Sequence, residues 1–176
     1  MYALSDATRI AETILARYCT TDVCSRATIA GSVRRGKAQV KDIEIVAEPI
    51  LAGLFGDTPS PEFYARLDGN PPGKVIKAGS KYRQYALPEG INLDLFIVTP
   101  PAQWGVILAI RTGPAELSHK LVTVRKHGGL LPSYARVEHG AVWVGDKAMH
   151  MPEEIDFLRF VGLDGVTAQE REERYG

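Results

Sequence analysis

Hydrophobic residues near the start of the chain recur at the spacing of an amphipathic helix. Ile10, Ile14 and Tyr18 fall on one face of a helix that we expect over residues 6–18. Ser5 precedes this stretch and is the expected N-cap, because a serine side chain can accept a hydrogen bond from the first turn. The first element is therefore predicted to be a helix with one apolar side.

Strict alternation of apolar and polar residues marks strands in the same region, most clearly in the segments KDIEIVA and INLDLFIV. The expected elements after the first helix are a short strand at 27–30, a strand at 41–47, a helix from Ser60-Pro61 to Leu67, a hairpin over 74–87 turning at Gly79-Ser80, and a strand at 91–98. This order predicts a mixed sheet with helices between its strands.

Pro100-Pro101 marks a boundary, because the hydrophobic period becomes helical beyond it. The expected later elements are helices at 104–111 and 114–127, a hairpin at 134–144 and a last helix at 152–161, followed by a polar, charged tail. The predicted fold class is α/β (α+β), with a mixed-sheet lobe over residues 1–100 and a smaller α+β lobe over residues 101–176.

The charge of the chain limits the classes of partner. With 21 basic and 21 acidic side chains, the net charge is zero. This excludes a nucleic-acid-binding protein that depends on overall positive charge, but it leaves open a local basic channel on a neutral protein. No apolar run approaches the ~20 residues of a membrane span, and no signal-peptide core is seen near the start. We therefore expect a cytoplasmic protein without a membrane partner. Its two cysteines, Cys19 and Cys24, are expected to be reduced thiols, and the alternative is a disulfide between these near neighbours.

Two expected strands carry carboxylates opposite their apolar faces. Asp42 and Glu44 leave one side of their strand while Ile43 and Ile45 point into the core, and Asp94 lies on the polar side of the later strand. If the strands are neighbours, three carboxylates converge, and such like charges are destabilising unless a cation neutralises them. Oxygen ligands of this kind suit Mg²⁺ or Mn²⁺, and a pair of ions could promote phosphoryl displacement.

A glycine turn, GSVRRG, precedes the first acidic strand. Gly31 permits a close approach of the backbone to a ligand, and the Ser32 hydroxyl with neighbouring N–H groups can cradle a phosphate. The cations that accompany this turn are Arg34, Arg35, Lys37 and Lys41. A basic loop beside a carboxylate cluster is what a complex of a metal with a triphosphate requires.

This combination resembles DNA polymerase family X of the nucleotidyltransferase superfamily. GSVRRG…KDIEIV is similar to the GS-x-RRG…D-h-D-h signature of that family, INLDLFIV to its third-aspartate strand, and RTGP at 111–114 to the TG turn of its thumb-like lobe. The chain resembles the minimal palm-plus-thumb type. The resemblance implies a nucleotidyltransferase palm over residues 1–100 and a thumb-like nucleotide-selection domain over residues 101–176.

The resemblance also implies roles for individual residues. Asp42 and Glu44 would bind two Mg²⁺ or Mn²⁺ ions, and Asp94 would bind the catalytic ion and help to activate the primer 3′-hydroxyl. The residues implied to hold the dNTP are Gly31, Ser32, Arg35 and Lys41 at the triphosphate, and Thr112 and Gly113 beside the sugar. Glu44 departs from the usual aspartate, and Asn92 and Phe96 flank Asp94 where some members have arginines.

Candidate DNA contacts are basic side chains of the second lobe. The helix expected over 114–127 carries Lys120, Arg125 and Lys126. In the first lobe, the hairpin expected over 74–87 adds a second basic cluster, formed by Lys74, Lys77, Lys81 and Arg83. Each cluster could equally be an ordinary solvated surface. Because the net charge is zero, weak and salt-dependent DNA binding is expected.

Three functional hypotheses follow from the sequence. The first is a monomeric, DNA-associated gap-filling DNA polymerase in repair, acting on gapped or nicked primer-template DNA and a dNTP. The second keeps the same site but transfers a nucleotidyl group to a small molecule or a protein, which the neutral charge favours. The third is a non-catalytic module that binds DNA ends or nucleotides.

Overall fold

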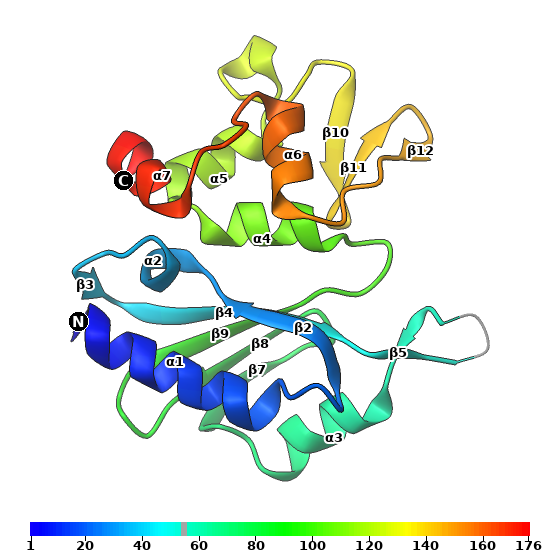
Figure 1. Cartoon of the computed structure of the whole chain (residues 1–176). Helices are drawn as coiled ribbons and strands as arrows, with labels where there is room; N and C mark the ends of the chain where they lie inside the picture. The colour runs from blue at the N-terminus through cyan, green and yellow to red at the C-terminus, as the bar shows by residue number, and fades with distance from the viewer. Residues whose placement is uncertain (54–55) are drawn as a thin grey trace. The chain divides into compact units, whose positions relative to one another are not determined.

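The computed structural model describes residues 1–53 and 56–176, which form two compact units, Met1–Pro100 and Pro101–Gly176 (Figure 1). The division falls at Pro100-Pro101, the position of the predicted lobe boundary. Both units combine helices with β-strands, so the α+β fold class is confirmed. Within the described residues, no helix has both the length and the apolar composition needed to cross a membrane.

The first unit is built on a five-stranded sheet with the order β2-β4-β9-β8-β7. Its strands are β2 (Cys24–Ile29), β4 (Asp42–Pro49), β7 (Lys74–Ala78), β8 (Tyr82–Ala86) and β9 (Asn92–Ile97). The central pair, β4 and β9, is parallel, and the other neighbouring strands are antiparallel. The strands and the hairpin predicted in this lobe are confirmed, with ends that differ by at most three residues.

Two helices, α1 (Leu4–Tyr18) and α3 (Pro61–Gly69), cover one face of this sheet (Figure 1). The alternating residues of β4 and β9 that point to this face are fully or almost fully buried, as predicted for Ile43 and Ile45. Each such side chain contributes roughly 1.5–3 kcal/mol when it leaves water. Burial of one face directs the polar residues of both strands to the opposite face.

The first helix begins earlier than the sequence predicts. Ser5 is not its N-cap, because α1 starts at Leu4 and Ala3 holds the cap position without a side-chain hydrogen bond. The preceding strand, β1 (Tyr2–Ala3), pairs with β3 (Gln39–Val40), and the Leu4 N–H donates to the carbonyl of Ala38. The backbone of a neighbouring segment therefore satisfies a donor that a capping side chain would otherwise serve.

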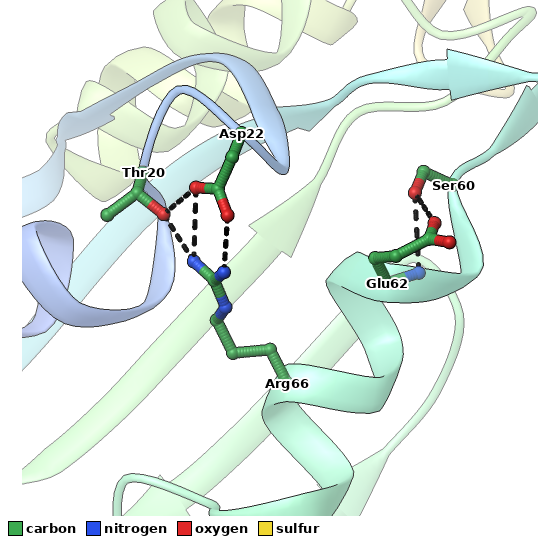
Figure 2. A network of polar contacts seen from close by, with 5 residues as sticks. All are labelled: Thr20, Asp22, Ser60, Glu62 and Arg66. Atoms are coloured by element: carbon green, nitrogen blue, oxygen red, sulfur yellow. Dashed lines mark hydrogen bonds and ion pairs between the residues drawn. The ribbon is translucent and has the colours of Figure 1, made fainter.

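The helix predicted from Ser60-Pro61 to Leu67 is confirmed as α3, which continues to Gly69, and Ser60 is its N-cap. The Ser60 hydroxyl accepts a hydrogen bond from the Glu62 N–H at 3.3 Å, directly before α3 (Figure 2). From the same helix, Arg66 reaches the turn between α1 and β2, where its Nη2 lies 2.6 Å from Asp22 Oδ2 and its Nη1 donates to Thr20. Beside α3, the short strands β5 (Leu51–Ala52) and β6 (Thr58–Pro59) pair with each other.

The second unit has its own hydrophobic core, which includes Val106, Leu117 and Phe157. Its elements are α4 (Trp104–Thr112), α5 (Ala115–Val122), the 3₁₀ turn η1 (Arg125–His127), β10 (Ala135–Glu138), β11 (Ala141–Val144), β12 (Lys147–Ala148), α6 (Glu154–Val161) and α7 (Ala168–Tyr175). The predicted helix at 104–111, the hairpin and the helix at 152–161 are confirmed.

One expectation for this unit is wrong. The helix predicted over 114–127 ends at Val122, because a run of β-branched residues follows and Leu131 takes part in backbone hydrogen bonds with Thr123 and Arg125. The polar, charged tail, for which no element was predicted, forms α7, and Thr167 caps this helix in a capping box with Glu170. The pattern Thr-x-x-Glu is a sequence signal that could have identified this helix.

Candidate functional site

The three predicted carboxylates lie on one face of the sheet. The parallel pairing of β4 with β9 sets Glu44 opposite Asp94 and Asp42 opposite Asn92. Residues directly opposite each other in neighbouring strands point to the same side, which here is the side away from the core of α1 and α3. All three carboxylates are half-buried. The condition that the two acidic strands be neighbours is therefore met.

The glycine turn is bonded to the acidic strand. Its first four residues form a single helical turn, α2 (Gly31–Arg34), and the Ala30 N–H donates to the Glu44 carbonyl at 2.8 Å. Gly31 has a φ of +58°, and a Cβ at this position would overlap the carboxylate of Glu44. Glycine is required here both by the backbone angle and by the close approach of Glu44.

Ser32 carries a buried polar atom that the described residues do not satisfy. Its hydroxyl oxygen is out of contact with solvent and has no hydrogen-bond partner in the part of the chain that the structure describes. Its carbonyl, by contrast, accepts the Lys37 N–H at 3.0 Å, which closes the turn. Because leaving a buried hydroxyl without a partner costs free energy, this atom is well suited to bind a polar ligand.

The electrostatics around Asp42 connect the carboxylates with the basic loop. Burial is the main cause that raises the pKa of Asp42 above its usual value, and the neighbouring charge of Asp94 raises it further. Lys41 and Arg35 act in the opposite direction and lower the pKa. These two cations therefore lie within electrostatic reach of Asp42.

Asp94 has two hydrogen-bond donors that sequence reasoning missed. Tyr82 Oη donates to Asp94 Oδ1 at 2.5 Å, and Gln84 Nε2 donates to the same oxygen at 2.9 Å. Both donors come from β8, which pairs with β9 so that Gln84 lies opposite Asp94 and Tyr82 opposite Phe96. The alternation Tyr-x-Gln in the predicted hairpin was the available signal, but its register against β9 could not be read from the sequence.

The residues present fit a hard divalent cation in their chemistry. Carboxylate oxygens are the ligands that Mg²⁺ and Mn²⁺ prefer, and the buried Ser32 hydroxyl is a further polar group on the adjoining turn. Within residues 1–53 and 56–176, however, no three His, Cys, Asp or Glu side chains gather closely enough to hold an ion, and the Glu44 carboxylate lies against Gly31. The two-ion site remains a prediction.

The predicted sugar contacts belong to the second unit. Thr112 is fully buried at the end of α4, and Gly113 follows with a φ of +68°. Gly113 is the C-cap of α4, and Pro114 connects it to α5. Their contribution to a site in the first unit remains a prediction.

The basic residues proposed for DNA binding do not form one helical row. Lys120 lies on α5 and pairs with Glu116 at 2.6 Å, whereas Arg125 and Lys126 lie on η1 beyond the end of the helix. In the hairpin of the first unit, Arg83 is only 6% exposed and pairs with Asp68, so it is not a surface cation. The exposed basic residues of that hairpin are Lys74, Lys77 and Lys81.

A cavity of about 660 Å³ occurs in the first unit, but it is lined by residues such as Asp57, Tyr64, Asp68 and Thr99. None of the predicted site residues lines it. The cavity therefore does not identify the site, and the arrangement of charged groups on the sheet is the stronger indication.

Taken together, the site offers three carboxylates on one sheet face, a buried hydroxyl and two nearby cations. Such groups can bind a cation together with a polyanion. No known protein family matches the chain, and no curated protein matches it. The likeness to family X polymerases therefore rests on the motifs of the sequence.

Proposed function

We propose that the protein is a metal-dependent nucleotidyltransferase of the family X DNA polymerase type. It transfers a nucleotide from a dNTP to a primer 3′-hydroxyl in short gaps and releases pyrophosphate. The observation that carries the proposal is the parallel pairing of β4 and β9, which sets Glu44 opposite Asp94 while the glycine turn is bonded to Glu44 through Ala30. Acidic strands and a phosphate-type turn thus share one end of the sheet.

Asp42, Glu44 and Asp94 are the residues that would hold one or two Mg²⁺ or Mn²⁺ ions. When bound, such ions supply positive charge to the attacking and leaving oxygens of a phosphoryl transfer. The raised pKa of Asp42, caused first by burial and then by Asp94, supports this role, since a cation would relieve the repulsion between the two like charges.

The remaining groups bind and orient the substrate. Arg35 and Lys41 lie near the carboxylates and would neutralise the triphosphate, and the Ser32 hydroxyl would hydrogen-bond to a phosphate oxygen. Asp94 would accept the proton of the primer hydroxyl or hold that hydroxyl in place. Positioning and electrostatic stabilisation then account for most of the rate, as is general for phosphoryl transfer.

The test is extension of a primer on a duplex with a one-nucleotide gap, with Mg²⁺ or Mn²⁺ and each dNTP singly. Asp94→Asn keeps the shape of the side chain and is expected to lower incorporation at least ~100-fold, whereas Asp146→Asn, at an exposed turn, serves as the matched control. Templated addition by the wild type and the control, but not by Asp94→Asn, would support the proposal. Absence of incorporation by folded wild-type protein would refute polymerase activity.

A second candidate keeps the site but changes the acceptor to a small molecule or a protein. The net charge of zero and the pairing of Lys120 with Glu116 favour it, because both reduce the positive potential available to DNA. Incubation with a labelled nucleoside triphosphate in the absence of DNA would distinguish the two. Labelling of a non-DNA acceptor that is lost in Asp94→Asn would support the second candidate.

A further inference from the structure

We infer that Tyr82 and Gln84 are positioning residues that fix the orientation of the Asp94 carboxylate for cation binding. This inference rests on the proposed function, since it concerns the same site. It assigns a role to β8, a strand that carries none of the motif carboxylates. The two side chains act on the substrate only through Asp94.

The geometry of the two hydrogen bonds supports this role. Both donors end on Oδ1 of Asp94, at 2.5 Å from Tyr82 Oη and at 2.9 Å from Gln84 Nε2, so neither of them uses Oδ2. Both distances lie within the range of ordinary hydrogen bonds. With Oδ1 held by two donors, the carboxylate cannot rotate freely, and Oδ2 remains as the oxygen for a cation.

The donors are themselves held in place. The Tyr82 ring stacks on Phe96 with centroids 5.2 Å apart and an angle of 24° between the planes, and Lys77 Nζ lies 5.4 Å from the centre of the Tyr82 ring. Gln84 lies directly opposite Asp94 in the pairing of β8 with β9. The phenol and the amide therefore meet Asp94 because the strand register brings them there.

Such an arrangement has a clear consequence for cation binding. Groups that hydrogen-bond to a metal-binding carboxylate orient it, and their loss typically weakens metal affinity or activity by about 10–100-fold. In this chain, Asn92 and Phe96 flank Asp94 on the same face of its strand, so neither of these neighbours is a cation. Here, two neutral donors on the adjacent strand orient the carboxylate without adding a positive charge that would compete with a cation.

The test measures Mn²⁺ binding to the metal-free chain, by the electron paramagnetic resonance signal of free Mn²⁺, without DNA or nucleotide. Tyr82→Phe removes only the hydroxyl and keeps the ring that stacks on Phe96. The matched control is Tyr64→Phe, since the Tyr64 hydroxyl donates to the Ser80 carbonyl at 2.8 Å and not to a carboxylate. We expect Tyr82→Phe to weaken Mn²⁺ binding about 10-fold and Tyr64→Phe to change it less than 2-fold.

A second variant tests the same role independently, in case Tyr82→Phe does not fold. Gln84→Met retains the length of the side chain without the donor and should also weaken binding, and Tyr82→Phe/Gln84→Met should weaken it most. With gapped DNA, Tyr82→Phe should lower kcat, raised Mn²⁺ should restore it, and the KM for dNTP should change little. If the wild type binds Mn²⁺ and both single variants bind it as tightly as Tyr64→Phe does, the positioning role is refuted but the proposed function is not. If the wild type does not bind Mn²⁺, both the positioning role and the proposed function are refuted.

Discussion

Replacement of Gly31 by alanine should destabilise the protein for two separable reasons. A non-glycine residue at a φ of +58° costs roughly 1–2 kcal/mol, of which about 0.4–1 kcal/mol is offset because alanine restricts the unfolded chain. The new Cβ would also overlap the Glu44 carboxylate, and moving that side chain away from its rotamer costs about 0.5–1.5 kcal/mol more. We expect a total loss of ~2 kcal/mol in the free energy of unfolding.

Gly145→Ala provides the matched control for the backbone part of this loss. Gly145 has a φ of +57°, nearly the same as Gly31, but a Cβ there meets nothing within 4 Å. Its replacement should cost only the net backbone penalty, which is about 1 kcal/mol or less. The difference between the two variants in urea denaturation therefore isolates the contact with Glu44.

A double-mutant cycle supplies the decisive measurement. In a Glu44→Ala background, Gly31→Ala should cost no more than Gly145→Ala, so the coupling energy between positions 31 and 44 should be about 1 kcal/mol. Mn²⁺ affinity should fall in Gly31→Ala, since the displaced carboxylate is one of the proposed ligands. A coupling energy near zero, or equal losses for the two glycine variants, would refute the reasoning.

Three further results are expected. Ser60→Ala should lower the free energy of unfolding by about 1 kcal/mol in urea denaturation, because it removes the cap that accepts the Glu62 N–H; no loss would mean that the cap is not used in solution. The pKa of Asp22 is lowered from 3.8 to about 2, first by its hydrogen bond with Arg66, so the charged carboxylate stabilises the fold above about pH 4 and this stabilisation is lost as the pH falls toward 2. Arg66→Gln should therefore reduce the loss of unfolding free energy between pH 4 and pH 2, and an unchanged dependence on pH would contradict this expectation. Asp42→Asn should raise the thermal midpoint of the metal-free chain at pH 7, because it removes a half-buried charge; a lower midpoint would contradict it.

The faces of the central strands could be predicted from the sequence because they depend only on alternation. Ile43 and Leu93 are fully buried, and the carboxylates beside them in the chain lie on the other face. The cap at Ser60 was predictable for a similar reason, since its partner lies two residues away. Patterns that act within a few residues of one another are fully present in the sequence.

Features that depend on register or on distant backbone could not be predicted in the same way. Ser5 has the composition of a cap, but the carbonyl of Ala38 satisfies the start of α1 instead. The contact of Tyr82 and Gln84 with Asp94 requires the pairing of β8 with β9, and a slip of one residue would turn both donors to the other face. Tertiary pairing decides such contacts, whereas the local pattern only makes them possible.

Two features of this sheet face lower the stability of the folded chain, and a bound ligand would relieve both of them. The pKa of Asp42 is raised chiefly by burial and then by Asp94, which means that its charged form is less favourable in the folded chain than in water. A buried Ser32 hydroxyl without a partner among the described residues adds a second unfavourable feature at the same end of the sheet. A bound cation and phosphate would relieve both at once, because the cation would neutralise the carboxylates and a phosphate oxygen would accept a hydrogen bond from the Ser32 hydroxyl. Since a ligand that binds only the folded state stabilises it, a rise in the thermal midpoint with Mg²⁺ and dNTP together follows from the same contacts that would perform the reaction.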